Sequence, residues 1–136
     1  MREGVELGVL IDLHTHSRPC SGDSVLTAQE LVERAAGAGL HAVALTEHDA
    51  IHAETEVRAL SERYGLAVLR GMEVTTEIGH VLVFGLTDYA PSLRSIEALR
   101  RAADAAGAVI FLAHRCRGNG CRSWCTAWRR STVRNI

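Results

Sequence analysis

The chain contains no lysine: all fifteen of its basic residues are arginine, and they stand against sixteen acidic residues. The charges are unevenly distributed, because six arginines and no acidic residue follow His114, whereas residues 1–114 carry a net charge of −7. The overall charge of this acidic body does not indicate a nucleic-acid-binding surface. Nucleic acid is therefore not an expected partner of the body.

Long apolar runs and a cysteine framework are also missing. No run is long enough to span a membrane, and residues 1–6 do not have the layout of a signal peptide. We therefore expect a cytoplasmic protein with no membrane partner. Only Cys20 precedes residue 115, so disulfides are not expected to support the fold. The 136 residues, 47% of them hydrophobic, have the composition of a single globular domain.

The most informative stretch is residues 10–17, LIDLHTHS, which predicts a short buried strand that ends in two histidines. Side chains two positions apart share one face of a strand, so Asp12, His14 and His16 should project together. Two imidazoles at a strand end are well placed to bind one metal ion. Ordinary half-buried histidines remain the alternative for this motif taken alone.

Strand-like and helix-like segments alternate along the rest of the chain. Helices are predicted over residues 27–39, 50–64 and 91–106, the first with a capping box at Thr27 and Glu30. Strands are predicted over 42–46, 66–70, 80–86 and 108–114. This alternation predicts an α/β fold with a mainly parallel sheet, in which 80–86 returns beside 66–70.

Chemistry in such sheets collects at the carboxyl ends of the strands. Six potential metal ligands are predicted to meet at that edge: His14, His16, His48, Glu73, His80 and His114. Asp23, in the loop after the first strand, is a seventh. Imidazoles and carboxylates without thiolates suit Zn, Mn or Fe. They are too many for one four-coordinate ion, so we expect a cluster with Glu73 as the bridge. Two ions about 3.5–4 Å apart suit the hydrolysis of phosphate esters.

Four motifs together resemble the PHP (polymerase and histidinol phosphatase) family over residues 8–114. They are DLHTHS at 12–17, TEHD at 46–49, GMEV at 71–74 followed by Gly79-His80, and Ala113-His114. The resemblance implies the N-terminal part of a distorted (β/α)7 barrel, similar to a TIM barrel. It also implies a stand-alone metal-dependent phosphoesterase that hydrolyses a phosphomonoester or nucleotide by a metal-bound hydroxide.

The resemblance further implies a role for each candidate ligand, with two or three divalent ions in a complete site. The two histidines of the first motif would bind one ion, and Glu73 would bridge two. Asp23 and His48 would serve a third ion, and His80 and His114 would complete the shared positions. Two interpretations of Asp49 remain open, since it is placed either to cap the following helix or to take part near the catalytic centre.

The resemblance fails after His114. The family's late Asp-x-His motif is missing from residues 115–136, and five strands do not close a barrel. We therefore expect residues 1–114 to form a partial domain and 115–136 an atypical tail. The alternative function is accordingly that of a catalytically impaired half-barrel, or of a scaffold that binds RNA or protein. The oligomeric state is left open.

Three hypotheses compete for this tail, which is rich in arginine, cysteine and tryptophan. The first hypothesis is a zinc site, although the three cysteines of the tail do not have the usual spacing of a zinc finger. Its arginines and two tryptophans could form a nucleic-acid-binding arm. The favoured hypothesis is out-of-frame coding sequence, because GC-rich DNA read in a shifted frame supplies these residues and the chain lacks lysine.

Overall fold

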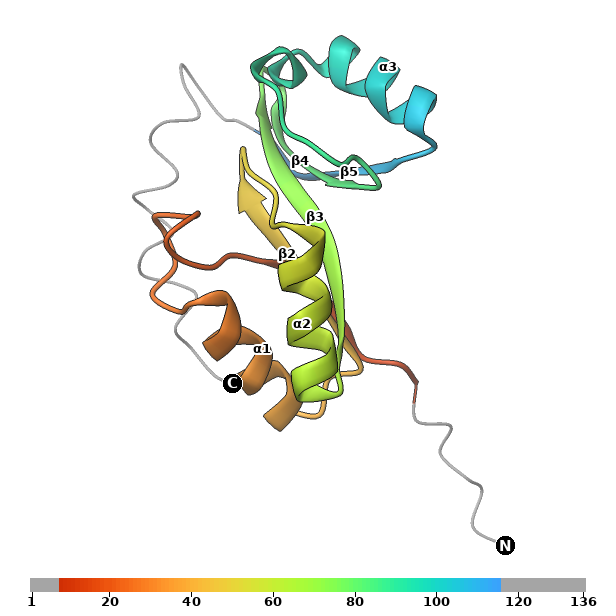
Figure 1. Cartoon of the computed structure of the whole chain (residues 1–136). Helices are drawn as coiled ribbons and strands as arrows, with labels where there is room; N and C mark the ends of the chain where they lie inside the picture. Colours follow the sequence, from red (N-terminus) through yellow and green to blue (C-terminus); the bar gives the residue numbers. More distant parts are fainter. Residues whose placement is uncertain (1–7, 116–136) are drawn as a thin grey trace, which may run out of the picture.

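The computed structural model describes residues 8–115 (Figure 1). In chain order, the elements of this part are β1 (Ile11–Thr15), α1 (Ala28–Gly37), β2 (Ala42–His48), α2 (Glu54–Tyr64), β3 (Ala67–Thr76), β4 (Gly79–Phe84), the 3₁₀-helix η1 (Pro91–Arg94), α3 (Ile96–Ala106) and β5 (Val109–Arg115). The predicted alternation of strands and helices is confirmed.

The five strands form one curled sheet in the order β1-β2-β3-β4-β5. β1, β2 and β3 are parallel, whereas β4 runs antiparallel to both β3 and β5. Only residues 77 and 78 separate β3 from β4. A connection this short allows only an antiparallel return, because a parallel pair needs a long crossover. The sheet therefore confirms the predicted α/β class and the predicted return of the fourth strand.

Two predicted helices begin later than the sequence indicated. The helix expected from residue 50 begins at Glu54, after Ala53 as its N-cap, so the interpretation of Asp49 as a helix cap is wrong. The helix expected from residue 91 is divided, because Ser95 lies between η1 and α3 and its side chain accepts a hydrogen bond from Ala98 N. Such a bond satisfies a free backbone donor in the first turn, which is why serine begins a helix well.

Two apolar cores cover the outer face of the sheet. α1 and α2 lie side by side over β2 and the first half of β3, where Val32, Val43 and Leu45 are buried (Figure 1). η1 and α3 cover β4 and the second half of β3 around Met72 and Leu99. The helices therefore lie on the convex side of the curl and leave its concave side open.

The concave side of the curl carries apolar side chains without a helix over them. Leu69 of β3 is partly exposed, and Val109 and Phe111 of β5 are about half-exposed.

The prediction that β1 is buried is wrong, because Ile11 and Leu13 are 47% and 44% exposed. β1 lies at the edge of the sheet and has a neighbour on one side only.

Arg115 is the first residue of the predicted tail and also the last residue of β5. The rest of that tail, with Cys116, Cys121 and Cys125, lies outside the described residues. Among residues 8–115, none of the helices has both the length and the apolar composition that a membrane crossing requires.

The tight turn between β3 and β4 predicts a stability effect at Gly79. Its φ is +145°, and a Cβ added there would collide with the carbonyl oxygen of His114 on β5. We expect Gly79→Ala to lower the free energy of unfolding by about 1–3 kcal/mol in urea titrations. The control is Gly37→Ala on α1, where an added Cβ meets no atom within 4 Å. That change should leave stability unchanged or raise it by up to about 1 kcal/mol; equal losses in both variants would contradict the prediction.

Candidate metal centre

The two histidines at the end of β1 meet a carboxylate from β3. The Nε2 atoms of His14 and His16 each lie 3.0 Å from Glu73 Oε2. The same two nitrogens lie 3.1 Å from one another. The positions of these three side chains at strand ends predicted that they meet at one edge of the sheet, and the structure brings them together.

His48, at the end of β2, lies between two carboxylates. Its Nδ1 is 3.2 Å from Glu73 Oε2, and its Nε2 is 2.8 Å from Asp23 Oδ2. His80 of β4 approaches the other oxygen of Glu73, with Nδ1 3.0 Å from Oε1. Three sets of side chains therefore have ligand atoms within 4.8 Å of one another: His14, His16 and Glu73; His16, Asp23 and His48; and His48, Glu73 and His80.

His114 is the most exposed of the seven predicted ligands. Its Nε2 lies 3.3 Å from Glu73 Oε1, and 47% of its side chain is exposed. It belongs to none of the three sets, which all lie in the described part of the chain. Partial burial, and then the neighbouring charge of His80, lower the pKa of His114. The exposure follows from its position on β5, the outermost strand of the sheet on that side.

Glu73 is the electrostatic centre of this cluster. Its side chain is 1% exposed, and burial by itself would favour the neutral acid. The imidazoles of His14, His16 and His80 lie 3.0 Å from its oxygens, and their attraction outweighs burial and holds the pKa of Glu73 far below its usual range. In return, the nearby carboxylate of Glu73 raises the pKa of His14. The carboxylate therefore stays ionised, in the form that binds cations.

Three buried atoms test whether metal ions fit this cluster. Among the described residues, Asp23 Oδ1, His48 Nδ1 and Glu73 Oε2 are buried side-chain atoms without a hydrogen-bond partner. Buried polar atoms in proteins are normally paired, so such atoms require an explanation. The oxygen of Glu73 also has three imidazole nitrogens within 3.2 Å. Divalent cations bound within these sets would satisfy these atoms, so the side chains present fit such ions.

An irregularity in β1 helps to place the first two histidines. The pairing of β1 with β2 shifts between Asp12 and Thr15. Within this shift, Asp12 Oδ1 accepts a hydrogen bond from His14 N at 3.1 Å, and Thr15 N donates to Thr46 Oγ1 at 3.1 Å. Asp12 thus holds the backbone of the strand that carries His14.

Asp49, which follows β2, has a backbone conformation that is uncommon for a residue other than glycine. Its φ is +48°. Its Oδ1 accepts from Thr75 N at 2.8 Å, its Oδ2 accepts from Arg94 at 2.7 Å, and its own N donates to Glu73 O at 3.0 Å. Asp49 therefore holds the end of β2 against β3 beside Glu73.

A second buried carboxylate, Glu47, received no role from the sequence. It lies on the helix-facing side of β2, is completely buried, and contacts Ser17, Ser21 and His52. One signal could have found it. Val43, Leu45 and Glu47 share one face of an otherwise apolar strand, and a carboxylate on a face covered by helices must have polar partners.

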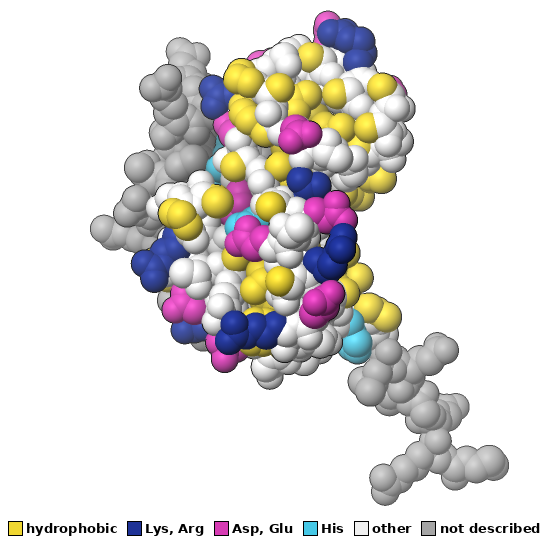
Figure 2. Space-filling view, in the orientation of Figure 1, with side chains coloured by type: hydrophobic (Ala, Val, Ile, Leu, Met, Phe, Trp, Pro, Cys, Tyr) yellow, Lys and Arg dark blue, Asp and Glu magenta, His cyan; other side chains and the backbone are white. Residues whose placement is uncertain are grey.

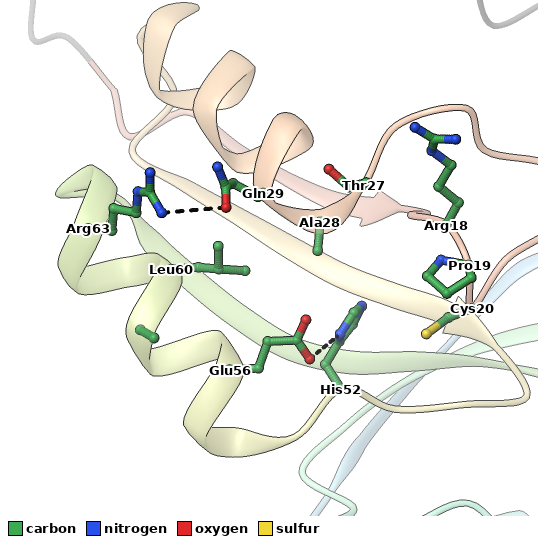
Figure 3. Close-up of a pocket in the computed structure, with 11 residues that line it drawn as sticks. Arg18, Pro19, Cys20, Thr27, Ala28, Gln29, His52, Glu56, Leu60 and Arg63 are labelled. Atoms are coloured by element: carbon green, nitrogen blue, oxygen red, sulfur yellow. Dashed lines mark hydrogen bonds and ion pairs between the residues drawn. The ribbon is translucent and has the colours of Figure 1, made fainter.

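His52 connects Glu47 to the surface. Its Nε2 lies 2.9 Å from Glu47 Oε1, and its Nδ1 lies 2.9 Å from Glu56 Oε2 on α2. Figure 3 shows His52 and Glu56 in a pocket between α1 and α2, which Arg18 and Arg63 also line. Figure 2 shows charged side chains of both signs spread over this face of the molecule. None of the predicted metal ligands lines this pocket.

The position of His52 predicts a stability that depends on pH. The hydrogen bond with Glu47 raises the pKa of His52 despite its burial. A raised pKa adds stability that is fully present below about 6.5 and is lost as the pH rises through the folded value. His52→Gln should therefore cost about 2 kcal/mol of unfolding free energy at acidic pH and less at alkaline pH.

Denaturant titrations across this pH range measure that difference. The control is Ser61→Ala, because Ser61 Oγ accepts a hydrogen bond from Val68 N at 2.8 Å and a serine hydroxyl does not titrate in this range. Its effect should be the same at each pH. A pH-independent loss for His52→Gln would contradict the prediction.

The pattern of the PHP domain matches residues 12–119 of the chain. A 3',5'-nucleoside bisphosphate phosphatase of Chromobacterium violaceum is 37% identical over 87 residues, covering 61% of this chain and 30% of that protein. A phosphoribosyl 1,2-cyclic phosphate 1,2-diphosphodiesterase of Eggerthella lenta is 36% identical over 91 residues, covering 62% and 34%.

A solved structure shares the fold. A "putative metal-dependent phosphoesterase" from Bifidobacterium adolescentis matches with a TM-score of 0.54 and 34% identity, over 70% of this chain and 34% of that one. The chain thus spans about a third of the length of the relatives it matches. The curled five-stranded sheet is accordingly a partial barrel of the TIM-like type, as the sequence predicted.

Proposed function

The chain belongs to the PHP domain family, and from this we propose that its histidine and carboxylate cluster binds divalent metal ions for the hydrolysis of phosphate esters. One observation carries the proposal most directly. Glu73 Oε2 is buried, lacks a hydrogen-bond partner, and faces the ring nitrogens of His14, His16 and His48 within 3.2 Å. A buried oxygen among three nitrogens is the arrangement expected around a shared cation.

The three sets of side chains define which residues would hold the ions. His14 and His16 would hold one ion with Glu73. Asp23 and His48 would hold a second, and Glu73 with His80 would connect this part of the cluster to the first. His114 would complete the site from β5. The nitrogen and carboxylate donors suit Mn, Zn or Fe, and two or three ions would occupy a complete site.

Bound divalent ions would supply Lewis-acid activation of water and of a phosphoryl oxygen. The residues of the chain supply negative charge and hold the strand ends in place. Glu73 stays ionised, so it offers negative charge at the centre of the cluster. The end of β2 is held beside it by Asp49.

The names of the relatives support a class of substrate. They specify a nucleoside bisphosphate and a phosphoribosyl cyclic phosphate. We propose accordingly that the substrate of this protein is a phosphorylated small molecule or a nucleotide. The expected cellular location remains the cytoplasm.

The first test concerns Glu73. Glu73→Gln keeps the shape of the side chain but removes its charge, so the ions lose their shared ligand. We expect the metal content after Mn²⁺ loading, measured by elemental analysis, to fall together with phosphate release from a 3',5'-bisphosphonucleoside. Both metal affinity and rate should drop by about 100-fold or more, since even the loss of an outer partner costs 10–100-fold.

Glu77→Gln is the matched control. The carboxylate of Glu77 accepts a hydrogen bond from Ile96 N at 3.0 Å, but it lies in the turn between β3 and β4, against the start of α3, and not in the cluster. This variant should keep its metal and its activity. Equal metal binding by Glu73→Gln and the parent protein would contradict the proposed site. A parent protein that binds no metal and releases no phosphate would favour the scaffold alternative.

Asp49 offers a second test, because both of its carboxylate oxygens are already engaged by Thr75 N and Arg94. We propose that it positions the end of β2 and does not exchange protons with substrate. Asp49→Asn keeps an acceptor for Thr75 N and tolerates a positive φ. We therefore expect it to retain activity within about 10-fold, whereas Asp49→Ala should lose more.

Steady-state rates of both variants at equal metal loading measure the effect. The control is Asp104→Asn on α3, where the carboxylate pairs with the exposed Arg100 of the same helix. That change should leave the rate unaltered. A rate loss of about 100-fold or more in Asp49→Asn would instead indicate direct acid–base participation.

A further inference from the structure

We propose that the pocket between α1 and α2 is a second binding site, which takes a small organic molecule with an anionic group, phosphate or carboxylate, at each of its two ends. The pocket lies on the helix-covered side of the sheet, and none of the proposed metal ligands lines it. The inference therefore goes beyond the proposed function and does not depend on bound metal ions.

The pocket has the size and the mixed lining of a small-molecule site. Its volume is about 460 Å³, within the range of about 300–1,000 Å³ that is common for such sites. Ala28 of α1 and Leu60 of α2 are 6% and 8% exposed and form its apolar middle. An organic molecule would bury carbon atoms against these side chains, which gives it an advantage over a free inorganic ion.

Two arginines line opposite ends of this pocket. Figure 3 shows Arg18 of the β1–α1 loop at one end and Arg63 of α2 at the other, with Ala28 and Leu60 between them. A guanidinium presents its N–H groups in a planar fork that matches a carboxylate or a phosphate. We therefore expect both ends of the bound molecule to be anionic and its middle to be less polar.

Both guanidinium groups have N–H donors available for an incoming anion. Arg63 Nη1 donates to Gln29 Oε1 at 3.5 Å, which is long for a hydrogen bond. Within residues 8–115, the arginines that form ion pairs with carboxylates are others, namely Arg58, Arg94 and Arg100.

The acidic side chain in the lining, Glu56, already has a partner. Its Oε2 lies 2.9 Å from Nδ1 of the buried His52. Glu30 also lies near Arg18, but its Oε2 accepts hydrogen bonds from Thr27 N and Oγ1 at 2.8 Å. Two arginines in the lining therefore stand against one engaged carboxylate. This local excess of positive charge contrasts with the net charge of −7 of residues 1–114 and favours an anionic ligand.

Backbone chemical shifts of the ¹⁵N-labelled full-length protein locate the binding site directly. The probes are the α,ω-dicarboxylates from malonate to pimelate and the matching α,ω-bisphosphonates, whose P–C bonds a phosphoesterase does not hydrolyse. We expect at least one probe to shift the amide signals of Cys20, Gln29 and Arg63 saturably, and the series that binds identifies the anionic group. Butyrate and propylphosphonate, which carry one anionic group, should bind about 10-fold or more weakly.

Three variants test the lining. Arg18→Gln and Arg63→Gln each remove one guanidinium and should weaken binding about 10-fold or more, because a charge-assisted hydrogen bond is lost. Ala59→Phe fills the pocket from the exposed side of α2 and should abolish binding although both arginines remain. Arg58→Gln is the matched control, because Arg58 lies on the same helix, pairs with Glu54 and does not line the pocket. It should bind like the parent protein.

The outcomes separate this inference from the proposed function. It would be overturned by a lack of saturable shifts at the three amides with every probe, by equal binding of the singly charged probes, or by an equal loss in Arg58→Gln. Shifts confined to residues around Glu73 would place the probe at the metal centre and also overturn the second site. Loss of metal binding in Glu73→Gln should leave the shifts at Arg63 unchanged. If Ala59→Phe does not fold, the two arginine variants decide.

Discussion

The site depends on the burial of one carboxylate among imidazoles. Glu73 is 1% exposed, and an ionised carboxylate in such a place is costly unless charged or hydrogen-bonding groups surround it. Its partners come from four strands, β1, β2, β4 and β5. The strand order and the antiparallel return of β4 are therefore conditions of the site, since each brings an imidazole to the same edge.

The sheet separates two polar systems that face opposite ways. On the concave side, Glu73 gathers the proposed metal ligands and leaves buried atoms unpaired. On the helix side, Glu47 is fully paired by Ser17, Ser21 and His52. A network in which every polar group is paired is rigid, because the loss of any partner would leave a buried polar group without a hydrogen bond in a low-dielectric environment. The cluster around Glu73 is thus the one suited to a cation, and the network around Glu47 stabilises the other face of the same strand.

The curl of the sheet explains the uneven covering of its two faces. Every helix of the described chain packs on the convex side, so the concave face exposes Leu69 and Phe111. The same geometry leaves His114 half-exposed at the outer strand. A partial barrel necessarily has this property, because in a closed barrel the facing strands fill the interior with side chains.

The sequence by itself determined the alternation of strands and helices, the return of the fourth strand, and the edge at which His14, His16, His48 and Glu73 meet. These features follow from periodicity and from the direction of side chains at strand ends, which are local properties of the chain. The same local signals failed at β1, where the apolar pattern predicted burial, and at residues 50–53, which precede α2.

Only the tertiary structure decided what surrounds Glu47. Its partners Ser17 and Ser21 lie 30 and 26 residues earlier in the chain, so no local pattern connects them. The exposure of β1 likewise depends on its place at the sheet edge rather than on its own residues. Burial and hydrogen bonding are properties of segments in contact, and a linear pattern specifies which side chains are available but not which of them meet.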